Sequence, residues 1–187
     1  MSKILAASAG LALAGAALAN SYNGAGYSFV DNSTVSSSVN VADNFTIADV
    51  SVTLNNITHT WVGDLVITLS NGSTSVDLIA RPGFTGTGFG SSGDLNGTYT
   101  FVDGGAAFPT TLTGTQIVPA GSYAPVTPLS AFAGQSSSGN WTLSVQDNAA
   151  GDTGALGSWT LNLTAVPTPG AAALLGLAGV AGLRRRR

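Results

Sequence analysis

Two short segments of nearly identical sequence most strongly limit the fold of this 187-residue chain. Residues 141–145 read WTLSV, and residues 159–163 read WTLNL. In both, large apolar residues alternate with small polar ones, which is the pattern of a β-strand with one buried face. A Gly-rich loop between them carries Asp147 and Asp152. The two segments therefore predict strands, and the loop is a place where binding residues can gather.

Further strand-like segments indicate that the whole region up to residue 165 is built from strands. They lie at residues 45–47, 50–54, 65–69, 76–80 and 97–102, with Gly, Asn, Asp and Pro between them. No helical periodicity occurs from residue 20 to 165. The pattern predicts an all-β fold, an antiparallel jelly-roll β-sandwich of about eight strands. Residues 20–38 are rich in Ser, Asn and Gly, so we expect a loosely ordered low-complexity arm leading to a first edge strand.

The N-terminus has the features of a secretory signal peptide. Lys3 precedes an apolar run at residues 4–18, and residues 17–19 read ALA, an A-x-A cleavage site. We therefore expect residues 1–19 to be a signal peptide and the protein to be exported.

The C-terminus has three parts that together predict a sorting or stop-transfer tail at residues 166–187. Pro167 and Pro169 precede an apolar run at residues 171–183, and Arg184–Arg187 follow. As a helix this run would span about 20 Å, less than the roughly 30 Å of a bilayer core. The arginines favour the cytoplasmic side of a membrane. We expect a short apolar helix that anchors the protein transiently or permanently.

This tail resembles the PEP-CTERM class of bacterial sorting signals, with Thr168 where the usual motif has Glu. The resemblance implies a sorting enzyme, an exosortase, that acts near Pro167–Pro169.

Charge excludes one large class of partners. Between the two terminal segments the chain has nine aspartates and one basic residue, Arg81, which leaves a net charge of −8. Nucleic-acid binding requires a basic surface, so we expect no nucleic-acid partner. An acidic domain favours divalent cations instead. The chain has no cysteine, which excludes disulfides and thiolate metal sites.

The loop carboxylates allow two interpretations. Calcium prefers several carboxylate and carbonyl oxygens, and Asp147 and Asp152 lie five residues apart on a loop that glycine lets fold back. Alternatively, each Asp caps backbone N–H groups of a turn. Asp64 stands at another turn, after His59, the single histidine. A Ser-His-Asp triad stays formally possible, but no G-x-S-x-G motif occurs, and we interpret His59 as structural.

Several segments together resemble the P domain (P/Homo B domain) of the proprotein convertases and their bacterial relatives. They are IADVSV (47–52), ITHT with GDL (57–60 and 63–65), LIAR (78–81) with the glycine-rich stretch to residue 93, PLSAFAG (128–134), and GNWTL through DTGALGSWTL (139–161). The resemblance covers residues 28–165. It implies an eight-stranded jelly roll, a link to subtilisin-like serine endopeptidases and proteolysis, and a calcium ion held by Asp64, Asp147 and Asp152.

The sequence thus predicts an exported, non-catalytic P-domain protein of a bacterial envelope or extracellular matrix, a structural or binding module stabilised by calcium. Its partners would be components of that envelope or matrix. The alternative is an accessory domain that docks on a separate subtilisin-like serine protease and stabilises it. We expect no enzyme activity, because no segment of the chain can house a subtilisin-like catalytic domain. A hydrolase acting through His59 is the third interpretation.

Overall fold

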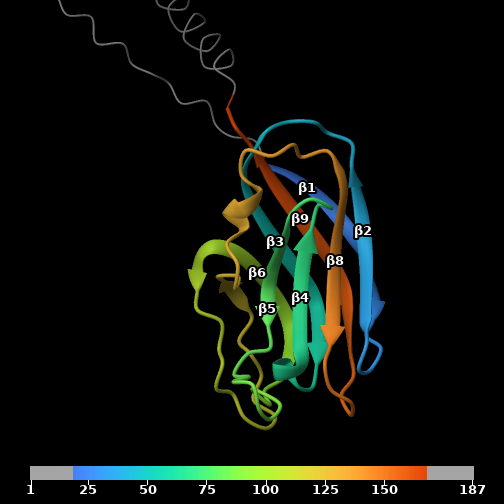
Figure 1. Cartoon of the computed structure of the whole chain (residues 1–187), viewed down its shortest axis with the longest axis vertical. Coiled ribbons are helices and arrows are strands. Elements are labelled where there is room, and N and C mark those ends of the chain that lie inside the picture. The colour runs from blue at the N-terminus through green and yellow to red at the C-terminus, as the bar shows by residue number, and fades with distance from the viewer. Residues whose placement is uncertain (1–18, 168–187) are drawn as a thin grey trace, which may run out of the picture. The chain divides into compact units, whose positions relative to one another are not determined.

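The computed structural model describes residues 19–167, and within them nine strands form two sheets (Figure 1). Two short 3-10 helices, η1 (Val62–Asp64) and η2 (Leu129–Phe132), are the other regular elements of this part. The all-β prediction is confirmed, with nine strands where about eight were expected. The strands are β1 (Ala19–Ser28), β2 (Thr34–Val41), β3 (Ile47–His59), β4 (Leu65–Ser70), β5 (Ser75–Ala80), β6 (Leu95–Ala106), β7 (Gly121–Tyr123), β8 (Gly139–Asp147) and β9 (Gly154–Ala165).

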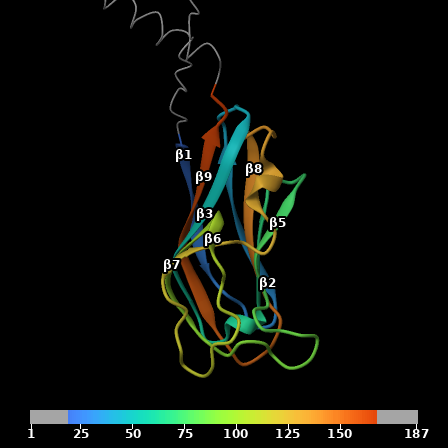
Figure 2. The ribbon, with the colours of Figure 1, turned by 90° about the vertical axis from the view of Figure 1, so that its left-hand side faces the viewer.

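The strands are arranged in two layers. One sheet has the order β1-β9-β3-β6-β7 and the other the order β2-β8-β4-β5. All neighbouring strands are antiparallel except β6 and the three-residue β7, which are parallel. Figure 2 shows the layers from the side, with β1, β9 and β3 in one and β2, β8 and β5 in the other. The jelly-roll connectivity stays a prediction.

The twin tryptophan segments supply the centre of the core, one from each sheet. Trp141 lies in β8 and Trp159 in β9, and both are fully buried. Buried residues alternate with less buried ones along both strands, as the sequence predicted. Each indole N–H also has a partner, since Trp141 donates to the Ser137 carbonyl at 2.9 Å and Trp159 to Ser37 Oγ at 2.7 Å.

The structure differs from the expectation of a loosely ordered arm at residues 20–38. Residues Ala19–Ser28 form β1, which pairs with β9 from Ala19 opposite Thr164 to Ser28 opposite Ala155. The strand is poor in large residues for a physical reason. A Cβ on Gly24 would overlap the indole of Trp159, so the neighbouring strand already fills that space. The compact unit consequently runs over residues Ala19–Ala165 rather than from residue 28.

The predicted terminal segments fall largely outside the described residues. Of the signal peptide only Ala19 is described, and of the sorting tail only Val166 and Pro167. Within residues 19–167, no helix has the length and apolar character needed to cross a bilayer.

Candidate cation site

The two segments with predicted site residues meet at one end of the sandwich. β3 ends at His59, and η1 then leads the chain into β4 with Asp64 at the junction. β8 ends at Asp147, and Asp152 follows in the loop before β9. Asn148 fastens this loop to η1, because its backbone N–H and its side-chain amide both donate to the Asp64 carbonyl, at 3.0 and 2.8 Å.

His59 has the structural role that the sequence predicted. It is 1% exposed, and its Nε2 lies 3.4 Å from Asp147 Oδ2. Its Nδ1 lies 3.0 Å from the carbonyl oxygen and 3.1 Å from the amide nitrogen of Trp61. A catalytic triad needs this second ring nitrogen for a serine hydroxyl. Because the Trp61 backbone occupies it, the His59–Asp147 pair joins the ends of β3 and β8 and is not part of a triad.

Asp147 and Asp152 already have partners for some of their oxygens. Asp147 is 3% exposed, and its Oδ1 accepts the N–H of Ala149 at 3.2 Å, in addition to the His59 contact. Asp152 is half-buried, and its Oδ1 accepts the Thr60 hydroxyl at 2.6 Å. Asp147 therefore has the turn-capping role that the sequence left open as the alternative to calcium.

Asp64 is the one carboxylate of this corner with a buried oxygen that lacks a hydrogen-bond partner among the described residues. It is 1% exposed, and its Oδ1 makes no hydrogen bond within the described residues. The nearest cation is Arg81, whose Nη2 lies 3.7 Å from that oxygen. This guanidinium is shared, because its Nε donates to the Gly63 carbonyl at 3.2 Å and its Cζ lies 3.8 Å above the Phe84 ring centre. The Asp64 charge is thus only partly compensated.

The electrostatics of Asp64 agree with this geometry. Burial is the main cause that raises its pKa above the ordinary value, and the charges of Asp147 and Asp152 raise the pKa further. The positive charge of Arg81 and the His59 ring act in the opposite direction. Since the net shift is upward, an additional cation at Asp64 would relieve an unfavourable buried charge.

A small cavity of about 200 Å³ lies at this corner. Asp64 and Asp152 line it, together with the rings of Trp61 and Phe89. The rings are held edge to face at 6.3 Å, and the Trp61 indole donates to the Phe89 carbonyl at 2.9 Å. Two carboxylates on one cavity, one of them buried and unpartnered, are the donor chemistry that Ca²⁺ prefers. Ala149 and Ala150 complete the lining.

The predicted set of three aspartates is therefore only partly brought together. Asp64 and Asp152 share the cavity, whereas Asp147 faces His59. Accordingly, no group of three or more His, Cys, Asp or Glu side chains in residues 19–167 is arranged to hold a metal. A cation here would need carbonyl or water oxygens in addition to the two carboxylates.

Sequence reasoning missed three residues of this corner. Arg81 had a usable signal, because it is the single basic residue between the terminal segments and follows a strand. Phe89 comes from a glycine-rich loop that lies far along the chain from Trp61. Nothing in the spacing of these two residues indicates that their rings meet.

The proprotein convertase P-domain family matches residues 47–163. The chain is similar in structure to the serine protease of Aeromonas sobria, at 15% identity and a TM-score of 0.43, over 79% of this chain and 27% of that one. It is equally similar to the same protease in complex with its chaperone, at 17% identity and a TM-score of 0.43, over 80% and 28% of the two chains.

The chain thus spans little more than a quarter of those structures. No curated protein matches it. Because the family match covers more than half of the chain, from β3 to β9, this protein belongs to the proprotein convertase P-domain family.

Proposed function

We propose that this protein is an exported, non-catalytic P-domain module of a bacterial envelope or extracellular matrix, and that calcium stabilises it. Family membership and the hydrogen bonds on both ring nitrogens of His59 support the non-catalytic part of this proposal. The one histidine of the chain has partners on both nitrogens and is buried, so it has no site for a nucleophile. Such a domain acts by binding and by supporting structure, and its targets are components of the envelope or matrix.

Calcium belongs to this proposal because Asp64, whose Oδ1 is buried without a hydrogen-bond partner, lines a cavity together with Asp152. In the proposed site these two carboxylates bind the ion. Asp147 does not bind the ion in this site. It stabilises the loop that carries Asp152, because its Oδ1 accepts the N–H of Ala149 at the start of that loop. The ion would neutralise the negative charge of Asp64, which Arg81 compensates only in part.

The non-catalytic role predicts that the compact unit Ala19–Ala165 hydrolyses neither peptide nor ester substrates above the buffer rate, with or without calcium. The measurement is release of a chromogenic leaving group from a panel of peptide and ester substrates. The matched variant is His59→Ala. Hydrolysis by the natural domain that the His59→Ala variant lacks would show that the histidine is catalytic.

The alternative is an accessory domain that docks on a separate subtilisin-like serine protease and stabilises it. Membership in a family named after proprotein convertases supports it, since that name ties P domains to proteases. Adding the purified domain to such a protease from the same cells would then raise the melting temperature of the protease. Unchanged protease stability and no co-purification would leave the independent module as the better account.

Export and anchoring complete the proposal and rest on the terminal segments of the sequence. Deleting residues 171–187 should release the protein into the medium, because both the apolar run and the arginines are lost. Fractionation and immunoblotting measure the released share. A second variant that changes only Arg184–Arg187 to alanine separates the contribution of charge from that of the apolar run. Unchanged retention of the deleted form would contradict an anchor at this end, as well as a sorting enzyme acting near Pro167–Pro169.

A further inference from the structure

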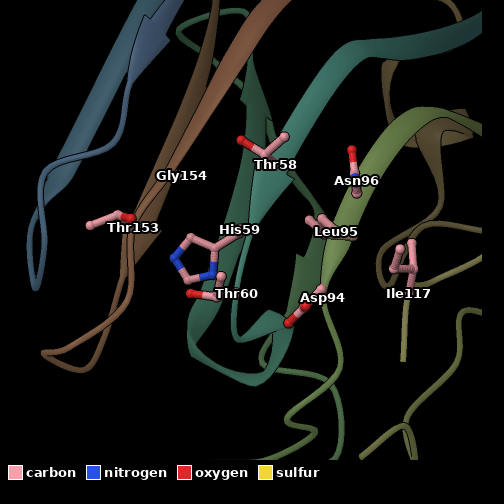
Figure 3. Close-up of a pocket in the computed structure, with 9 residues that line it drawn as sticks. All are labelled: Thr58, His59, Thr60, Asp94, Leu95, Asn96, Ile117, Thr153 and Gly154. Carbon is pink, nitrogen blue, oxygen red and sulfur yellow. The ribbon is translucent and has the colours of Figure 1, made fainter. Parts of the chain in front are cut away.

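A second cavity, of about 430 Å³, lies near the His59 corner (Figure 3). It lies where the end of β3 meets the beginnings of β6 and β9, and Ile117 closes one side. None of the aspartates of the candidate cation site lines it. It is therefore a different cavity, and it shares with that corner the residues His59 and Thr60, which contact Asp147 and Asp152.

The strand register determines which side chains face this cavity from the sheet. Thr58 of β3 pairs with Asn96 of β6, and both side chains are exposed. The next pair, His59 with Leu95, is buried. Since successive residues of a strand face opposite sides, Thr58 and Asn96 point outward while His59 and Leu95 point into the core. Asn96 and Thr58 thus stand side by side on the outer face.

The cavity collects polar groups that the fold itself does not use. The side chains of Thr58, Asp94, Asn96 and Thr153 make no hydrogen bond within residues 19–167. Thr60 lines the same cavity, and its hydroxyl by contrast binds Asp152. The free groups are two hydroxyls and an amide, which both donate and accept, and one carboxylate, which accepts. A ligand that both donates and accepts hydrogen bonds could therefore pair with all of these side chains.

Backbone hydrogen bonds hold the rim of the cavity in place. The N–H of Asp94 donates to the Gln116 carbonyl at 2.8 Å, and the N–H of Val118 donates to the Asp94 carbonyl at 2.8 Å. These bonds fix Ile117 beside Asp94 while its side chain stays 48% exposed. The rim therefore presents one apolar surface next to the polar groups. A rim fixed in advance lowers the entropic cost of binding.

Charge limits the class of ligand. No lysine or arginine lines the cavity, and its one acidic residue is Asp94, so a phosphate, sulfate or carboxylate ligand would find no positive partner there. Asp94 is half-exposed, and an ion pair at such a position contributes little, which disfavours a cationic ligand. A neutral ligand with many hydroxyls and an apolar C–H face satisfies both the polar groups and Ile117.

We propose that the cavity formed by Thr58, Asp94, Asn96, Ile117 and Thr153 binds a neutral sugar unit of a saccharide. Asp94 and Asn96 accept from its hydroxyls, the two threonines exchange hydrogen bonds with it, and Ile117 contacts its ring. The inference deepens the proposed role as a binding module by naming the ligand class. It does not depend on calcium or on a protease partner.

Titration of the isotope-labelled unit Ala19–Ala165 with the methyl glycosides of glucose, galactose, mannose and N-acetylglucosamine tests the proposal by nuclear magnetic resonance. At least one sugar should shift the amide signals of Asn96, Ile117 and Thr153 with millimolar affinity. Asn96→Ala and Thr153→Val should each weaken binding about three- to tenfold, because each removes a hydrogen bond between neutral groups. Both changes are at the surface and leave the fold intact.

Asp49→Ala is the matched control for an Asp94→Ala variant. Asp49 is exposed on the same β3 strand, ten residues from His59 and therefore about 30 Å away. Asp94→Ala should abolish binding, and Asp49→Ala should leave it unchanged. Shifts with none of the four glycosides, or shifts outside this cavity, would overturn the proposal. Binding of tetralysine in place of the sugars would overturn it as well, in favour of a basic peptide. The hydrolysis assay varies His59, and the calcium response is tested at Asp64 and Asp152. The sugar titration changes none of these three residues, so its outcome is separate.

Discussion

Replacing Asp64 with asparagine should stabilise the domain in EDTA and abolish its stabilisation by calcium. Without a cation the buried Asp64 charge is only partly compensated, and a neutral amide removes that cost. With calcium at about 100 times its Kd, the natural domain should gain about 2.7 kcal/mol. For a domain of this size the melting temperature would then rise by about 5–10 °C. Differential scanning calorimetry in EDTA and in excess calcium measures both effects.

Two further variants make this result specific. Asp152→Asn should reduce the calcium response, because Asp152 lines the same cavity, whereas Asp49→Asn on the exposed part of β3 should not. Equal melting temperatures of the natural domain in calcium and in EDTA would remove calcium from the proposal. A lower melting temperature of Asp64→Asn in EDTA would show that Arg81 already compensates the charge.

The pH dependence of the metal-free domain gives an independent check on Asp64. Its pKa is raised in the folded state, mainly by burial, so the folded domain binds this proton more tightly than the unfolded chain, whose Asp pKa is about 3.9. The contribution of Asp64 to the free energy of unfolding is therefore highest below about pH 3.9. It declines as pH rises through the raised pKa of the folded state. Urea unfolding at several pH values should show this decline as the difference between the natural domain and Asp64→Asn.

Trp159→Ala should cost about 3–5 kcal/mol of unfolding free energy, the largest loss that we expect from a single change. The indole is fully buried, donates to Ser37 Oγ and fills the space above Gly24. Since Gly24 has no side chain, β1 cannot fill the resulting cavity. Thermal unfolding should show a melting temperature lower by about 6–20 °C.

A double-mutant cycle with Gly24→Ala isolates this contact. In the natural domain Gly24→Ala should destabilise by about 1–3 kcal/mol, because its Cβ would overlap the Trp159 ring. In the Trp159→Ala background the same change should be close to neutral, which gives a large coupling energy. Additive effects of the two changes would show that β1 does not lie against the indole as described.

The sequence predicted those strands in which apolar and polar residues alternate within the strand itself. β8 and β9 alternate apolar and polar residues around Trp141 and Trp159, and both residues are buried as expected. β1 carries no such signal, because Gly24 stands where Trp159 of β9 leaves no room for a side chain. Residues 19–28 form a strand because they pair with β9, and their own sequence does not indicate this pairing.

The same limit applies to the candidate site. Asp64 and Asp152 were predicted as calcium ligands from the resemblance to P domains, and the structure brings them to one cavity. The division between them and Asp147 depends on His59, whose ring direction is set by the backbone of Trp61. Such a contact results from three-dimensional packing and cannot be predicted from residue types and their spacing.

The pairing of β9 with β3 has a consequence for how the domain would meet its surroundings. Ala165, at the C-terminal end of β9, lies opposite Ile47, whereas Gly154, at its beginning, lies opposite His59. The strand between them spans about 35 Å. A protein tethered to a surface beyond Ala165 would thus hold both cavities at the distal end of the sandwich. β9 would serve as a rigid spacer that places the binding end within reach of soluble or matrix-borne ligands.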